Sequence, residues 1–126
     1  IDDWAAVSRV WPGLEGRTYA FADMVAGGAL LQLGSDAPVA PLDPWLAMSA
    51  AVGRKTPDGS VWSPDQRLTA EEALAASVNG AGPVTVGCPA DLVLLAEDPL
   101  RLGAEELARV RPLATIVAGA VAHQRI

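Results

Sequence analysis

The sequence contains one cysteine and one histidine among its 126 residues. A lone cysteine cannot form an internal disulfide and belongs to no cysteine zinc motif, so we expect a chain from the reducing cytoplasm. Cys88 lies in a Gly-Cys-Pro turn without an adjacent basic residue, which argues against a nucleophile. His123 lies in a predicted terminal hairpin, where we expect a surface or edge residue.

Basic residues are also few, since nine Lys and Arg stand against fifteen Asp and Glu, for a net charge of -6. They are scattered, which argues against nucleic acid as a partner. No window approaches the roughly 18 apolar residues of a membrane-spanning helix, so no membrane partner is expected. The chain opens with Ile-Asp-Asp-Trp instead of Met or a signal peptide, which indicates a trimmed chain or part of a longer protein. Its 51% apolar residues are enough for a folded core.

The most distinctive stretch is residues 29–38, Ala-Leu-Leu-Gln-Leu-Gly-Ser-Asp-Ala-Pro. Its short apolar run, bounded by glycines, predicts a strand buried on both faces, as in a parallel sheet. Asp36 follows directly, and α/β enzymes place their chemistry at the carboxyl ends of such strands. In the alternative interpretation Asp36 only stabilises a turn, because Ser-Asp-x-Pro is a good turn sequence.

Four segments in the first two thirds of the chain have helical spacing or helix-start signals. Asp43 precedes a proline and is expected to cap one helix, and Thr69 with Glu72 forms a capping box at the start of another. Phe21, Met24 and Val25 are expected on one apolar face. The predicted helices cover residues 1–12, 18–26, 44–53 and 70–78.

Beyond residue 82 the pattern changes to short aliphatic runs separated by turns. Strands are predicted over residues 84–86, 91–96, 114–117 and 121–123, and the last two are expected to form a hairpin. A helix is predicted over residues 104–110, between the second and third of these strands. Asp91 enters a strand and is expected to be structural, like Asp43. The chain is therefore predicted as an α/β layer over residues 1–82 followed by a sheet module over residues 83–126.

In succession, four motifs resemble the carboxyl-terminal portion of the amidohydrolase superfamily, in the amidohydrolase family 3 branch of formamide deformylase-like and N-acyl amino acid deacylase-like enzymes. They agree in order and spacing over roughly residues 11 to 122. The motifs are Gly34-Ser-Asp-Ala-Pro-Val with Pro41-Leu-Asp-Pro, Trp62 to Leu68 followed by Thr69-x-Glu-Glu-Ala-Leu, Val86-Gly-x-Pro-Ala-Asp-Leu-Val, and Asp98-Pro leading to Thr115-Ile-Val-x-Gly.

The resemblance implies that residues 30–34 form the eighth strand of a (β/α)8 barrel and that residues 83–126 contribute to the flanking small β-sandwich. It also implies that Asp36 binds the catalytic divalent metal, expected to be Zn2+, and takes a proton from the attacking water. Such chemistry is reasonable because metal-bound water is acidified and a nearby carboxylate can accept its proton.

The other metal ligands of that family are missing from this sequence, including its His-x-His motif. Catalytic zinc takes about three protein ligands, so this chain alone is expected neither to hold the metal nor to be active. A barrel strand also needs neighbours on both sides, so the 126 residues alone should leave it exposed. The expected partner is the missing amino-terminal portion of the same protein or another copy.

Two functions remain open from the sequence. The intact protein is predicted to be a metal-dependent amidohydrolase that cleaves a C-N bond in a small amide, formamide or cyclic amide substrate. The alternative is a non-catalytic α/β module for binding or assembly. The loops over residues 37–42 and 54–62 are expected to line the pocket, with Arg54 and Lys55 as nearby cations, and Trp62 either walls the pocket or pins its loop to the core.

Overall fold

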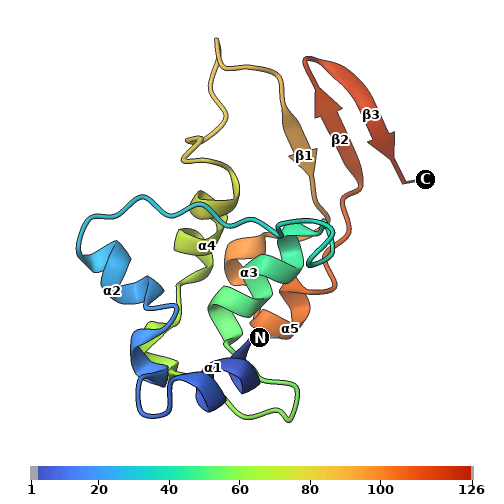
Figure 1. Cartoon of the computed structure of the whole chain (residues 1–126). Helices are drawn as coiled ribbons and strands as arrows, with labels where there is room; N and C mark the ends of the chain where they lie inside the picture. The colour runs from blue at the N-terminus through green and yellow to red at the C-terminus, as the bar shows by residue number, and fades with distance from the viewer. Residues whose placement is uncertain (1–2, 126) are drawn as a thin grey trace.

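Helices and a small antiparallel sheet occupy separate parts of the computed structural model, which describes residues 3–125 (Figure 1). The sheet extends away from the helices and ends at the carboxyl terminus. The helices are α1 (Trp4–Val10), α2 (Phe21–Ala26), α3 (Pro44–Gly53), α4 (Ala70–Ser77) and α5 (Ala104–Leu107), with the 3-10 helices η1 (Glu15–Arg17), η2 (Pro64–Gln66) and η3 (Pro99–Arg101). The strands are β1 (Leu92–Leu94), β2 (Ala114–Val117) and β3 (Ala120–Gln124).

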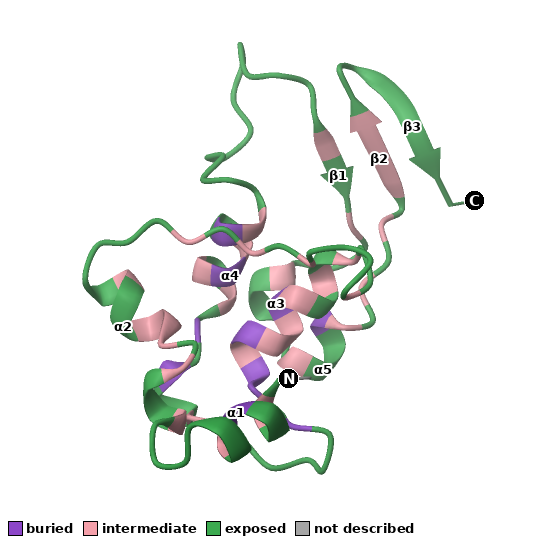
Figure 2. Ribbon diagram, viewed as in Figure 1, coloured by how far each residue is buried: buried purple, intermediate pink, exposed green. Residues whose placement is uncertain are grey.

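The hydrophobic core forms around α3, which packs against both α4 and α5. Met48 of α3 and Leu107 of α5 are its largest fully buried side chains. Alanines on the facing helices allow this close approach because they add little side-chain bulk. Figure 2 shows the buried residues concentrated in these helices and the segments beside them. The core cluster consists of Met48, Ala51, Leu68, Ala73 and Leu107.

The predicted starts of α3 and α4 are confirmed. The Asp43 side chain accepts a hydrogen bond from the Trp45 amide at 3.0 Å and so caps α3. At α4, the Thr69 hydroxyl accepts from the Glu72 amide at 3.1 Å, while the Glu72 carboxylate accepts from the Thr69 amide at 2.7 Å. These are local signals, and they place both helices as the sequence indicates.

Three helical details differ from the sequence-based expectation. α2 begins at Phe21 instead of residue 18. Met24 was expected on the apolar face of this helix but is 46% exposed. Phe21 and Val25 do pack against the core, as expected. α5 ends at Leu107 instead of residue 110. The amides of residues 109 and 110 bond to carbonyls three positions earlier, which tightens the chain into a turn.

The sheet is antiparallel throughout, in the order β1-β2-β3, and the predicted terminal hairpin is confirmed. Its turn is tied to the start of β1, because Asp91 Oδ1 accepts a hydrogen bond from the Ala118 amide at 2.7 Å. The strand predicted over residues 84–86 is wrong. Val84 is 76% exposed and Val86 is fully exposed, and this segment pairs with no strand of the described residues.

The strand predicted over residues 29–33 does not form either, and the expectation that it is buried on both faces is wrong. Leu30 is 99% exposed, whereas Leu31 and Leu33 pack against the core. Burial alternates between residues 31 and 35, as in an extended chain with one covered face. No neighbouring strand lies beside it within residues 3–125, so its backbone forms no strand ladder. The segment is therefore exposed on one face only, through residues such as Leu30.

No helix of the described chain is both long enough and apolar enough to cross a membrane.

Candidate functional site

A cavity of about 690 Å³ lies between the extended segment 33–36, α3 and the loop after α3. Both loops that the sequence predicts as pocket walls contribute to it, through residues 39–41 and through residues 54–56 with Trp62. The polar and aromatic residues that line the cavity include Tyr19, Phe21, Ser35, Asp36, Arg54 and Trp62.

Asp36 is an exposed residue on this wall, in a turn that the main chain closes. The Val39 amide donates to the Asp36 carbonyl at 2.9 Å, and the Ala40 amide donates to the Ser35 carbonyl at 3.2 Å. Asp36 has a left-handed backbone with φ 49°, which aspartate tolerates better than most residues. Within residues 3–125 its carboxylate accepts no hydrogen bond, so the turn does not use this side chain.

Arg54 is the C-cap of α3 and also has a left-handed backbone, with φ 49° and ψ 35°. Its side chain turns into the protein, and the residue is only 5% exposed. Its Nε donates to the Trp62 carbonyl at 2.8 Å and its Nη1 donates to the Tyr19 carbonyl at 3.1 Å. Burial lowers the pKa of the Arg54 guanidinium below its usual value.

Two aromatic rings lie against the guanidinium, and the ring of Tyr19 packs against both of them. The Arg54 Cζ lies 5.2 Å from the Trp62 ring centroid and 6.0 Å from that of Phe21, both within cation-π range. Tyr19 contacts Trp62 edge-to-face, with ring centroids 5.5 Å apart. The Tyr19 hydroxyl donates to Asp3 Oδ2 at 2.6 Å, and this hydrogen bond raises the pKa of the tyrosine above its usual value.

The residues present do not by themselves fit a metal ion. Across residues 3–125 no three His, Cys, Asp or Glu side chains are grouped to hold one. Asp36 offers a single carboxylate, fewer than the three protein ligands that a catalytic zinc ion takes.

The other acidic and potential metal-ligating residues occupy structural or surface positions. Asp43 caps α3, and Asp91 ties β1 to the hairpin turn, as expected for both. His123 is exposed on the edge strand β3, also as expected, and Cys88 is exposed.

The burial of Arg54 is the feature that the sequence did not indicate. A loop arginine beside a lysine suggests two solvated cations, and Lys55 is indeed exposed in an ion pair with Glu105. Arg54 differs because its backbone turns left-handed at the end of the helix. The one local signal was its place after a helix-ending glycine, in a loop that returns to a tryptophan.

Comparison with known proteins gives one family over nearly the whole chain. The model of the "Amidohydrolase family" matches residues 1–123. The chain is 30% identical to the "N-substituted formamide deformylase" of Arthrobacter pascens, over 97% of this chain and 25% of that protein. It is 35% identical to "Protein LONG AFTER FAR-RED 3" of Arabidopsis thaliana, over 62% of this chain and 15% of that protein. The chain thus spans a quarter or less of the length of these relatives, and no solved structure matches it significantly.

Proposed function

The chain belongs to the amidohydrolase family, in its family 3 branch, and from that premise we propose that it is the carboxyl-terminal part of a metal-dependent hydrolase. The bond cleaved is the C-N bond of an amide, formamide or cyclic amide in a small-molecule substrate. The family match over residues 1–123 is the observation that carries this proposal. A relative named for deformylation of N-substituted formamides supports the bond type.

Asp36 is the residue to which we assign the proton transfers. Its exposed carboxylate lines the cavity and is not used by the turn that holds it, so it is free to accept a proton from water. Attack of that water on the carbonyl carbon forms a C-O bond, and the same carboxyl group can then donate its proton to the leaving nitrogen as the C-N bond breaks.

Metal dependence belongs to the same proposal, with Asp36 as one ligand. Since the described residues do not form a metal site alone, the remaining ligands are assigned to parts of the protein outside residues 3–125, and activity is assigned to the intact protein. If those ligands do not exist, the alternative of a non-catalytic binding or assembly module is favoured.

Replacement of Asp36 by asparagine tests this assignment. In the full-length protein, Asp36→Asn is expected to reduce turnover of N-alkyl formamides by about 10²- to 10⁴-fold, the usual contribution of a general acid-base group. The measurement is formate release with and without added zinc, together with Tm, which should change little because the carboxylate has no structural partner within residues 3–125.

Asp65→Asn is the matched control, since Asp65 is also an exposed aspartate but does not line the cavity. It should leave turnover unchanged. If Asp36→Asn hydrolyses formamides as fast as this control, the catalytic role of Asp36 is wrong. If the wild-type protein hydrolyses no amide or formamide under any metal condition, the binding module is the better description.

A further inference from the structure

A second cavity, of about 720 Å³, lies where the chain passes between the helices and the sheet. It is lined by the segment that leaves β1, by α5 with the turn after it, and by the residue that follows β3. Among the described residues it shares no lining residue with the cavity beside Asp36. A ligand in this second cavity would therefore bind separately from the proposed site of hydrolysis.

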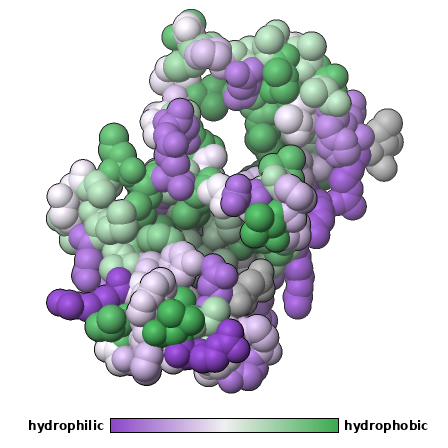
Figure 3. Space-filling view, in the orientation of Figure 1, coloured by the Kyte–Doolittle hydropathy of each residue, from purple (hydrophilic) through white to green (hydrophobic). Residues whose placement is uncertain are grey.

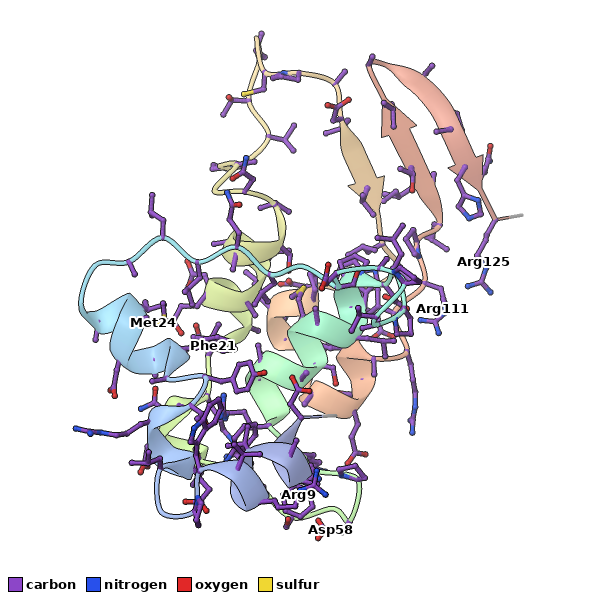
Figure 4. All side chains as sticks on the ribbon, viewed as in Figure 1. Arg9, Phe21, Met24, Asp58, Arg111 and Arg125 are labelled. Atoms are coloured by element: carbon purple, nitrogen blue, oxygen red, sulfur yellow. The ribbon has the colours of Figure 1, made fainter. Side chains whose placement is uncertain are left out.

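Three of the nine basic residues of the sequence line this cavity, and they are Arg109, Arg111 and Arg125. All three are exposed to solvent. The fold brings them together from two segments, because the Arg125 amide donates to the carbonyl of Leu113, two residues after Arg111, at 2.8 Å. Figure 4 shows Arg111 and Arg125 at the same edge of the molecule. A chain with a net charge of -6 thus gathers positive charge at one place.

Acidic residues in the lining compensate this charge only in part. Glu97 and Glu106 also line the cavity, so its lining residues carry three positive charges and two negative ones. The Glu106 carboxylate is already engaged, since it accepts a hydrogen bond from the Gly103 amide at 2.7 Å. An excess of positive charge therefore remains for an anion.

The guanidinium groups keep most of their donors for a ligand. Arg111 is positioned by the backbone, since its Nη1 donates to the Val110 carbonyl at 2.7 Å, and the same nitrogen lies 3.7 Å from an Asp43 carboxylate oxygen. Its Nε and Nη2 have no acceptor within residues 3–125. The side chains of Arg109 and Arg125 form no ion pair or hydrogen bond within that range. Guanidinium donors arranged in this way are suited to several oxygens of one anion.

We propose that this cavity binds an organic phosphate, with the phosphate on the three arginines. A phosphate group carries a charge of about -1.5 to -2 at pH 7 and has three acceptor oxygens, so it matches several guanidinium groups better than a carboxylate does. The cavity volume is within the range of small-molecule sites. Apolar side chains of the lining are expected to contact the carbon part of the ligand, and they belong to Leu95, Leu102, Val110 and Leu113.

Equilibrium dialysis of the full-length protein against phenyl phosphate tests this site. An ionic strength of about 0.15 M screens exposed charges beyond about 8 Å and so limits non-specific attraction. Phenyl phosphate is expected to bind saturably, inorganic phosphate more weakly because it lacks the apolar ring, and phenol not at all because it lacks the charge.

Matched arginine variants assign the binding to this cavity. Arg109→Gln and Arg125→Gln should each weaken phenyl phosphate binding about fivefold or more, the loss of one charge-assisted contact. Arg101→Gln is the control, since Arg101 is also an exposed arginine but does not line the cavity, and it should leave binding unchanged. Arg125→Lys keeps the charge without the planar fork and should fall between wild type and Arg125→Gln. Tm reports whether each variant is folded.

The inference is overturned if phenyl phosphate does not bind saturably, if phenol or inorganic phosphate binds as well, or if the folded Arg109 and Arg125 variants bind like wild type. An equal loss in Arg101→Gln would also overturn it, because a general effect of charge would then explain the binding. Asp36→Asn should bind phenyl phosphate like wild type, and a loss there would place the ligand in the other cavity. Formate release is measured separately, so failure of the hydrolase assignment leaves this test unaffected.

Discussion

Three residues that line the cavity, Tyr19, Asp36 and Arg54, have left-handed backbone conformations, with φ of 51°, 49° and 49°. Each such residue other than glycine costs about 1 kcal/mol or more. Within residues 3–125, the other non-glycine residues of this kind do not line the cavity; they are Ser63, Asn79 and Ala118. For Arg54 the conformation coincides with a side chain that turns inward. The energetic cost of these left-handed backbone conformations is therefore found at residues that form the cavity wall.

Asp58, at the tip of the loop after α3 (Figure 4), provides a test of local hydrogen bonding. Its carboxylate accepts from the Thr56 hydroxyl and from the amide and hydroxyl of Ser60, and these bonds hold its pKa at about 2. Thr56→Val should raise this pKa toward the usual 3.8, as measured by carbon NMR titration of the carboxyl group.

The sign of the pH effect follows from that depressed pKa. The charged carboxylate stabilises the folded loop fully above pH 3.8, and this stabilisation is lost as the pH falls toward about 2. In Thr56→Val the loss should be smaller across the same window. An Asp58 pKa that stays near 2 in the variant would contradict the assigned cause.

At the scale of elements, α3 and α5 approach each other closely at Gly53. A Cβ atom added there would lie 2.7 Å from the Ala104 Cβ, too close without movement of a helix. Gly53→Ala is therefore expected to lower the free energy of unfolding by about 1–2 kcal/mol, since overpacking outweighs the higher helix propensity of alanine.

A double-mutant cycle with Ala104→Gly provides the control for this contact. The second change removes the opposing methyl group, so the double variant should recover about 1 kcal/mol relative to the sum of the single variants. Urea unfolding monitored by circular dichroism measures each value. Additive effects would show that the two positions do not interact.

The elements that the sequence predicted correctly are those with local signals. Asp43, Thr69 and Glu72 act within three residues of their own positions, so α3 and α4 start where expected. Strand formation depends on partners elsewhere in the chain. The segments 29–33 and 84–86 have suitable side chains but no neighbouring strand within residues 3–125, so neither forms a ladder.

The same difference between local signals and long-range contacts applies to the candidate functional site. The sequence predicted Asp36 beside a binding crevice because an apolar run ends in Gly-Ser-Asp. Asp36 does line the cavity although that run forms no strand, and its catalytic role remains a prediction. The burial of Arg54 depends on Tyr19, 35 positions earlier, and on Trp62, 8 positions later. Contacts over such separations are set by packing and are not encoded in a local motif.

At the scale of the whole molecule, much apolar surface lies open. Figure 3 shows open space between the segment that follows α4 and the sheet, with hydrophobic residues gathered on the sheet. Val93, Leu94, Val117 and Val121 are each more than half exposed, and Leu30 is almost fully so. Surfaces of this kind normally face another part of a protein or a partner.

This exposure predicts the behaviour of residues 1–126 expressed alone. The fragment should self-associate in size-exclusion chromatography, bind the hydrophobic dye ANS, and be cut first in the segment between α4 and β1 during limited proteolysis. The full-length protein should show none of these properties. A fragment that is monomeric, melts cooperatively and binds no ANS would contradict the prediction.

Leu107, which is fully buried among the helices, comes from the part of the chain that lies between β1 and β2. The chain leaves the sheet, contributes this side chain to the helical core, and then returns to complete the sheet. A chimera that exchanged residues 83–126 for those of a relative would therefore also exchange a piece of the core around Met48. Substitutions at these two positions are therefore expected to affect stability jointly, and such a chimera should be most stable when both segments come from the same parent.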